Sequence, residues 1–160
     1  MREVGTKVSV VGNHDLDFGT NHLKKWQEEG SYHFLAANLV ERERKSIPKY
    51  ILPYQIIECQ GIKIAIIGLA TMENLDTAVR PEDILELEIL NGTACAKRWI
   101  PFLNEGKDKR GKPDIIIALT HFGLKYNEKG MVDGEEILDL CKNTKGIGRV
   151  LQLIGINLCQ

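Results

Sequence analysis

The sequence predicts an α/β fold, and three observations support this prediction. Strand-like and helix-like segments alternate along the 160 residues. Two segments, 62–69 and 114–120, are apolar on both faces, which is typical of central strands in a sheet covered on both sides. Hydrophobic residues make up 43% of the chain and charged residues 27%, which suits one domain with a real core and a solvated surface.

The elements of the first half follow from local signals. Residues 7–11 form a short β-branched run and predict a strand, and residues 33–39 predict a second one. Between them, a helix is expected to be capped by Thr20 or Asn21 and to stop at Gly30. Each strand in this half is therefore followed by a turn or a helix.

The second half predicts a hairpin and two more helices. Residues 54–59 and 62–69 flank a glycine turn and are typical of two antiparallel strands. Residues 93–104 and 135–143 predict helices, placed before and after the apolar strand at 114–120. We expect functional groups at the carboxyl ends of the strands, because ligands gather at that edge of α/β sheets.

Composition excludes several classes of function. The chain has 21 Lys and Arg against 22 Asp and Glu, a net charge of -1, so we expect no nucleic-acid partner. The longest apolar stretches are of strand length, so no membrane span is expected. The charge runs at 41–45 and 107–112 are interpreted as solvated loops. The four cysteines lack zinc-site or disulfide spacing and are interpreted as buried or inert thiols.

The main chemical signal is the octapeptide GNHDLDFG at residues 12–19. Gly12 lets the backbone turn sharply after the first strand. Asn13 offers an amide oxygen that can bind a divalent cation, and His14 can donate a hydrogen bond or a proton to a phosphoryl or leaving oxygen. Asp17 lies about one helical turn further on and can hold the imidazole in one tautomer. His22 and His33 lack such surroundings and are expected to be structural or solvated.

The octapeptide resembles the Gly-Asn-His-Asp/Glu signature of the calcineurin-like metallophosphoesterases. It is most similar to the GNHEFDYG form of the branch that contains 5'-nucleotidases and 2',3'-cyclic-nucleotide phosphodiesterases. Segments LAANL (35–39), YQIIECQGIKIAIIGLAT (54–71) and DIIIALTHFG (114–123) also resemble that branch. The resemblance implies the fold as a fragment of the family's αββα sandwich, two packed mixed sheets flanked by helices.

The resemblance also implies a set of site residues. Asn13 and His121 would be ligands of one metal ion in a two-metal centre. His14 would contact the phosphate and act in catalysis, with Asp17 as its dyad partner, whereas Asp15 receives no direct role. The expected cofactors are divalent ions of the Mn, Zn, Mg, Ca or Co type, and the expected substrate is a nucleotide or other phosphoester. Two such ions clamp a phosphate and activate water for attack.

The family pattern is incomplete in this sequence. An Asp-x-His strand and a Gly-Asp segment precede the Asn-His motif in the family, and a Gly-His-x-His turn follows it; none of the three occurs here. We divide the chain into a partial phosphoesterase domain at 1–147 and a divergent tail at 148–160, for which a frameshift is the hypothesis. Reading the other frames of the gene after codon 147 tests it. Two neutral ligands hold a cation poorly, so we expect this chain to be inactive or weakly active.

Three functions stay open from the sequence. The chain is a fragment of a two-metal phosphoesterase that hydrolyses nucleotide phosphoesters, a non-catalytic α/β module that binds an anion or a partner, or a remnant without function. No GxGxxG or P-loop is present, which disfavours a dinucleotide or NTP site. The resemblance implies that the family's first strands and the strand at its Gly-His-x-His turn are central in the two-sheet core. Without them, exposed sheet edges and apolar faces are expected to promote self-association and low stability. Relatives in the family are commonly exported, but the printed N-terminus lacks a signal peptide, so no location is predicted.

Overall fold

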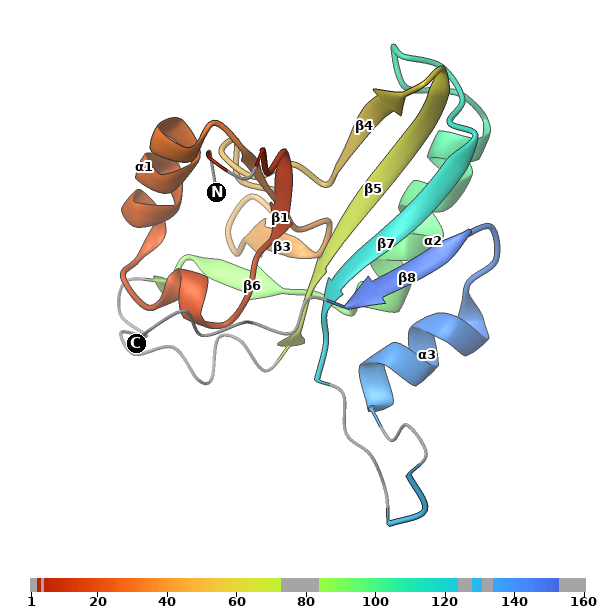
Figure 1. The fold of residues 1–160 in the computed structure, drawn as a ribbon. Coiled ribbons are helices and arrows are strands. Elements are labelled where there is room, and N and C mark those ends of the chain that lie inside the picture. The colour runs from red at the N-terminus through yellow and green to blue at the C-terminus, as the bar shows by residue number, and fades with distance from the viewer. Residues whose placement is uncertain (1–2, 4, 73–83, 124–127, 131–133, 153–160) are drawn as a thin grey trace.

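The computed structural model describes residues 3, 5–72, 84–123, 128–130 and 134–152. Its secondary structure (Figure 1) runs β1 (Val8–Val10), a 3₁₀ turn (His14–Leu16), α1 (Thr20–Gly30), β2 (His33–Leu35), β3 (Leu39–Glu41), β4 (Tyr54–Cys59), β5 (Ile62–Ala70), β6 (Leu87–Ile89), α2 (Gly92–Asn104), β7 (Ile115–His121), α3 (Glu135–Asn143) and β8 (Arg149–Gln152). The α/β class predicted from the sequence is confirmed. The short strand β6 was not predicted, because three residues carry too little periodic signal.

Two layers of sheet pack face to face between helices. The larger sheet has the order β4-β5-β7-β8, with β4 and β5 antiparallel and the other pairs parallel. The parallel pair β1-β2 packs against β5 and β7, and β3 pairs with β6 in a separate antiparallel ribbon. Helices α2 and α3 cover the outer face of the larger sheet, and α1 lies beyond β1 and β2 (Figure 1). This layering confirms the predicted αββα sandwich.

Two apolar cores hold these layers together. One lies between α1 and the β1-β2 and β3-β6 ribbons and contains the fully buried Leu23 together with the buried Phe34. The other lies between the four-stranded sheet and helices α2 and α3 and contains the buried Ile67, Ile100 and Leu140. Burying side chains of this size contributes about 1.5–3 kcal/mol each. The helices are therefore held by packing, as their amphipathic sequences indicate.

The two sheet layers touch each other at Gly68. A Cβ atom at this position would lie 2.3 Å from the Cβ of Leu35 and 2.5 Å from its carbonyl carbon and oxygen. The N–H of Ala37 donates to the carbonyl of Gly68 at 2.7 Å, which ties the end of β2 to β5. Only glycine fits between backbones at such a distance. This contact places the carboxyl ends of β1 and β7 near each other.

The single strand predicted at 33–39 is wrong, because the chain breaks between β2 and β3. The cause is the side chain of Asn38, which is fully buried. Its amide nitrogen donates to the carbonyls of Ala70 at 2.7 Å and Leu90 at 2.9 Å, and its oxygen accepts from the N–H of Ala70 at 2.9 Å. The side-chain amide of Asn38 thus makes bonds to the backbone where a continuous strand would make backbone–backbone bonds. The chain before it, β2, pairs with β1, and the chain after it, β3, pairs with β6.

Helix α1 begins and ends differently from the prediction. Gly19 takes the N-cap position with φ +77° and makes no side-chain cap bond, so Thr20 is the first helical residue and not a cap. The residue in the left-handed conformation after the helix is Ser31, with φ +54°, while Gly30 stays helical. The glycine expected to stop the helix is therefore its last residue.

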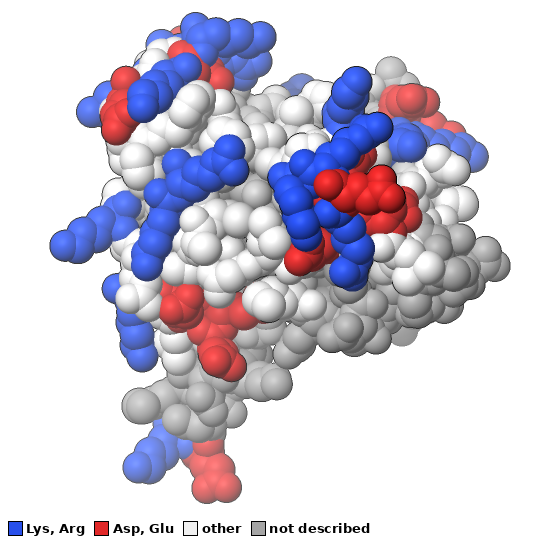
Figure 2. Space-filling model, turned by 180° about the vertical axis from the view of Figure 1, so that it is seen from behind, with Lys and Arg blue, Asp and Glu red and all other residues white. Residues whose placement is uncertain are grey.

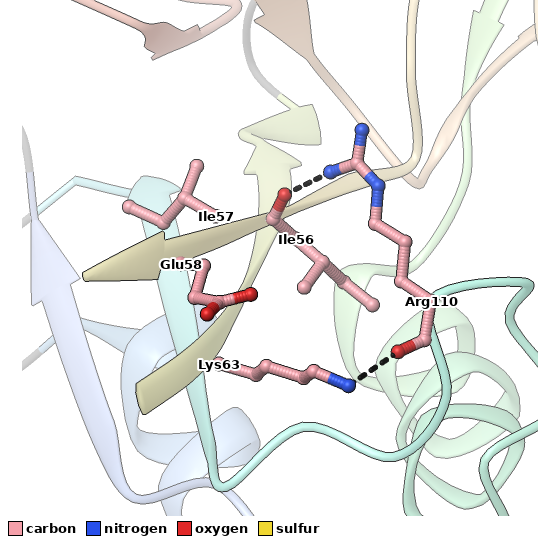
Figure 3. Close-up of a pocket in the computed structure, with 5 residues that line it drawn as sticks. All are labelled: Ile56, Ile57, Glu58, Lys63 and Arg110. Carbon is pink, nitrogen blue, oxygen red and sulfur yellow. Dashed lines mark hydrogen bonds between the residues drawn. The ribbon is translucent and has the colours of Figure 1, made fainter. Parts of the chain in front are cut away.

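The charge run at 107–112 lies in a loop in which Lys107, Lys109, Arg110 and Lys112 are exposed, which agrees with its interpretation as a solvated loop. One of its residues, Arg110, also contacts β4 (Figure 3). The guanidinium of Arg110 donates to the carbonyl of Ile56, and Lys63 Nζ donates to the carbonyl of Arg110 at 2.8 Å. A pocket of ≈ 410 Å³ lies at this contact and is lined by Ile56, Ile57, Glu58, Lys63 and Arg110. Because β4 is an edge strand, Arg110 covers a carbonyl that another chain could otherwise pair with.

Charges of both signs lie on the described part of one face of the molecule. On the face drawn in Figure 2, Lys and Arg side chains are interspersed with Asp and Glu side chains. In the described parts of the chain, no helix is both long enough and apolar enough to cross a bilayer. The thiols were expected to be buried or inert, and burial is wrong for Cys59 and Cys141, which are exposed. Cys95 is half-buried, and burial raises the pKa of its thiol. Cys159 lies outside the described residues.

Part of the segment assigned to the tail joins the larger sheet. Arg149–Gln152 form β8, which pairs in parallel with β7 and places Arg149 opposite Ile117. Residues 153–160 lie outside the described part of the chain. The division of the chain at residue 147 stays a prediction.

Candidate functional site

The octapeptide follows β1 directly and folds into a tight turn. The single 3₁₀ turn at His14–Leu16 brings the imidazole of His14 beside the carboxylate of Asp17, with 2.8 Å between Nδ1 and Oδ2. The Asp17 side chain is 11% exposed, whereas the His14 side chain is 71% exposed. A carboxylate at this distance fixes the orientation of the ring and favours a proton on Nδ1. The Nε2 atom of His14 has no hydrogen-bond partner among the described residues.

Asp15 closes the same loop from the other side. Its Oδ2 atom accepts a hydrogen bond from the N–H of Gly12 at 2.7 Å. Burial raises the pKa of the Asp15 carboxyl above its ordinary value, while the bond from Gly12 and the nearby His14 act in the opposite direction. Burial, and then the charge of Asp15, raise the pKa of Tyr32 to about 12. The loop is therefore fixed by two carboxylates that face different partners.

Asn13 and His121 come together from different sheet layers. His121 is the last residue of β7, opposite Ala70 of β5. Its Nε2 atom lies 3.0 Å from Oδ1 of Asn13, although 108 residues separate the two in sequence. Gly12 lies against the same ring, since a Cβ on it would be 3.0 Å from Cε1 and 3.2 Å from each ring nitrogen. The two residues predicted to share a metal ion are thus in direct contact.

The donor atoms of this pair suit a divalent cation. An amide oxygen and an imidazole nitrogen are ligands that Mn²⁺ and Zn²⁺ accept. In the observed geometry Nε2–H of His121 donates to Asn13, so that nitrogen must lose its proton before it binds an ion. Within the described ranges, no group of three or more His, Cys, Asp and Glu side chains is arranged to hold an ion. The chemistry of the pair fits a cation, and the number of donors is that of a partial site.

Two other histidines, His22 and His33, are not part of the Asn13–His121 pair. His22 Nδ1 donates to the carbonyl of Phe18 at 2.6 Å, and its ring centroid lies 6.0 Å from that of Trp26. His33 is exposed at the start of β2. These positions agree with the structural or solvated roles expected for them.

Three features beside the site were missed from the sequence. Glu136 of α3 accepts from the hydroxyl of Thr71 at 2.5 Å and from the N–H of Met72 at 3.2 Å, which ties α3 to the end of β5. Asp15 was given no role, although an Asp three residues after a turn glycine is typical of a side chain that bonds a nearby N–H. A cleft of ≈ 1040 Å³ also opens where α2 and α3 begin, beside Phe122.

Comparison with known proteins supports the resemblance to the 5'-nucleotidases. No family model matches the chain. A 5'-nucleotidase of Vibrio cholerae is 35% identical over 127 residues, which cover 79% of this chain and 22% of that protein. Protein UshA of Yersinia enterocolitica is 32% identical over 123 residues, 77% of this chain and 21% of its own length. The chain spans about a fifth of the length of these relatives.

A solved structure shares the fold and carries the family name. Calcineurin-like phosphoesterase YfkN from Bacillus subtilis matches with a TM-score of 0.72 and 21% identity, over 91% of this chain and 44% of that one. At this identity the match supports the architecture, whereas the sequence relatives support the kinship. The chain therefore belongs to the calcineurin-like metallophosphoesterases, in the branch of the 5'-nucleotidases.

Proposed function

We propose that this chain forms one part of the catalytic centre of a metal-dependent phosphoesterase that acts on nucleotide phosphoesters. The observation that carries the proposal is the contact of 3.0 Å between Asn13 and His121, next to the His14–Asp17 pair. The names of the sequence relatives, which are 5'-nucleotidases, support a nucleotide as the substrate class.

Each residue has a role in this proposal. Asn13 Oδ1 and His121 Nε2 would hold one divalent ion of the Mn, Zn, Mg, Ca or Co type. Bound there, the ion would offset negative charge on the phosphoryl group and make water a better nucleophile. His14 would donate a hydrogen bond from Nε2 to a phosphoryl oxygen or a proton to the leaving oxygen. Asp17 would hold the His14 ring in place through Nδ1.

The partial site limits what the chain does by itself. Asn13 and His121 are both neutral ligands, so no protein charge at the pair offsets the cost of removing water from the ion. We therefore propose weak cation binding and little turnover for these 160 residues. Full activity would require carboxylate ligands supplied from elsewhere in a longer parent protein.

Zinc binding tests the ligand roles. In isothermal titration with Zn²⁺, we expect Asn13→Ala and His121→Ala each to weaken binding by roughly 10-fold or more, because each removes a ligand of a two-ligand site. The matched control is His33→Ala, which removes an exposed imidazole at the start of β2 and should leave the affinity unchanged. Equal affinities for all three variants would contradict the proposal.

Phosphate binding tests the role of His14 in the same samples. His14→Asn is expected to keep the zinc affinity and to weaken the binding of inorganic phosphate to the zinc-loaded chain. If phosphate binds equally well in EDTA, and Asn13→Ala leaves that binding intact, the chain is an anion-binding module that needs no metal. Rapid, metal-dependent release of phosphate from AMP by the wild type would overturn the expectation of low activity.

We also propose that copies of the chain associate through open sheet edges. The N–H of Val11 donates to Leu35 at 3.1 Å, so strand alternation directs the backbone groups of Val8 and Val10 away from β2. In the described residues, no strand pairs with this side of β1, and none lies beyond β8. Unpaired edges of this kind favour pairing with another chain.

Light scattering after size exclusion measures this association. We expect the mass to rise above that of a monomer with increasing protein concentration. Val8→Pro removes an outward N–H that β2 does not use, and it should shift the equilibrium toward monomer. A wild type that is monomeric at every concentration would contradict the proposal.

A further inference from the structure

The carboxylate of Asp15 satisfies a backbone donor that the sheet leaves unused. At the end of β1, the N–H of Val11 faces β2 and donates to the carbonyl of Leu35. The next donor along the strand, the N–H of Gly12, therefore points to the opposite side, where Asp15 Oδ2 accepts it at 2.7 Å. A half-buried donor of this kind needs a partner, because leaving it unpaired costs about 1–3 kcal/mol.

The Gly12 backbone, which Asp15 holds through this hydrogen bond, also lies against the ring of His121. The backbone of Gly12 lies so close to the imidazole that an added Cβ would sit 3.0 Å from Cε1. Asn13 is the next residue, and its Oδ1 lies 3.0 Å from Nε2 of the same ring. A displacement of Gly12 would therefore change both the packing on the ring and the reach of Asn13.

We infer that Asp15 is a positioning residue of the candidate site, which fixes the backbone of Gly12 so that Asn13 and His121 present their donor atoms to one point. The inference rests on the proposed function in that it treats this pair as cation ligands. Asp15 acts through the loop: its hydrogen bond in the structure is to Gly12, and it makes none to Asn13, His14 or His121. Its role is therefore that of a hydrogen-bond acceptor.

An acceptor role predicts that an amide rescues what alanine removes. Asp15→Asn keeps an oxygen in reach of the Gly12 N–H and removes the charge, whereas Asp15→Ala removes the acceptor. The matched control is Asp114→Ala, because Asp114 also accepts a backbone N–H, that of Lys63 at 2.8 Å, but lies far from the site at the start of β7. All three variants lose a carboxylate, and only one loses the bond that holds the loop.

The test measures the His121 resonance in the metal-free chain first and the affinity for Zn²⁺ second. By NMR, Asp15→Ala is expected to shift the Cε1–H resonance of His121, while Asp15→Asn and Asp114→Ala leave it at its wild-type position. By calorimetry, Asp15→Ala is expected to weaken Zn²⁺ binding by about 10-fold, with the affinity restored in Asp15→Asn. Gly12→Ala, whose Cβ must push the imidazole, should shift the same resonance and serves if Asp15→Ala does not fold.

Two results overturn the inference. One is an unchanged His121 resonance in a folded Asp15→Ala variant or, where that variant does not fold, in Gly12→Ala. The other is an Asp15→Asn variant as perturbed as Asp15→Ala, which would assign the effect to charge. Failure of the proposed function looks different: if the wild type binds no zinc, or binds it without Asn13, the resonance of His121 in the metal-free chain still reports on Asp15.

Discussion

Replacing Gly68 by alanine is expected to lower the free energy of unfolding by roughly 3 kcal/mol or more. The new methyl group would lie 2.3 Å from the Cβ of Leu35 and 2.5 Å from its backbone carbonyl, and backbone atoms cannot rotate away. The two sheet layers must therefore separate, which also lengthens the hydrogen bond from Ala37 to Gly68. Because this contact joins the layer that carries Asn13 to the layer that carries His121, the site should open as well.

Urea denaturation followed by circular dichroism measures this loss. Gly123→Ala is the matched control, because among the described residues no atom beyond its chain neighbours lies within 4 Å of a Cβ built there, and its φ is not positive. We expect this control to change stability by less than about 0.5 kcal/mol. A Gly68→Ala variant as stable as the control would show that the sheet layers are not in backbone contact.

The second large effect is expected at Asn38, where leucine of similar volume should cost roughly 3–5 kcal/mol. The substitution leaves the N–H and carbonyl of Ala70 and the carbonyl of Leu90 without the partner that the amide now provides. Asn38 is fully buried, so water cannot replace those bonds. Ala70 lies opposite His121 in the sheet, so the position of the ring should be affected too.

Thermal and urea unfolding of Asn38→Leu give the magnitude of this effect. The matched control is Asn143→Leu, since the Asn143 amide also donates a hydrogen bond, to Asp139 at 2.6 Å, but does so at an exposed position on α3. The control should stay within about 0.5 kcal/mol of the wild type. If both variants are equally stable, the buried amide does not hold β5 to the β3-β6 ribbon.

Much of the local structure was predictable, because its causes lie close together in sequence. The hairpin of β4 and β5 follows from Gln60 and Gly61, which both take positive φ, of +51° and +79°. Strands β5 and β7 follow from apolar residues on both faces, which only a central strand can bury. The contact of His14 with Asp17 follows from a spacing of three residues in one helical turn.

The break between β2 and β3 could not be predicted in this way. LAANL contains no proline or glycine to interrupt a strand, and the partners of Asn38 lie 32 and 52 residues away. The contact of Arg110 with β4 could not be predicted for the same reason, since Arg110 bonds to Ile56, 54 residues before it. In both cases a polar side chain found a distant backbone group that no local pattern announces.

The sequence by itself determined the order of most elements, the His14–Asp17 pair and the family resemblance, because each depends on residues a few positions apart or on a contiguous motif. The tertiary structure decided that Asn13 reaches His121 and that Asp15 holds Gly12 against the same ring. These contacts depend on how closely two sheets approach at Gly68. That distance is set by the packing of the whole core, and no single segment of the chain encodes it.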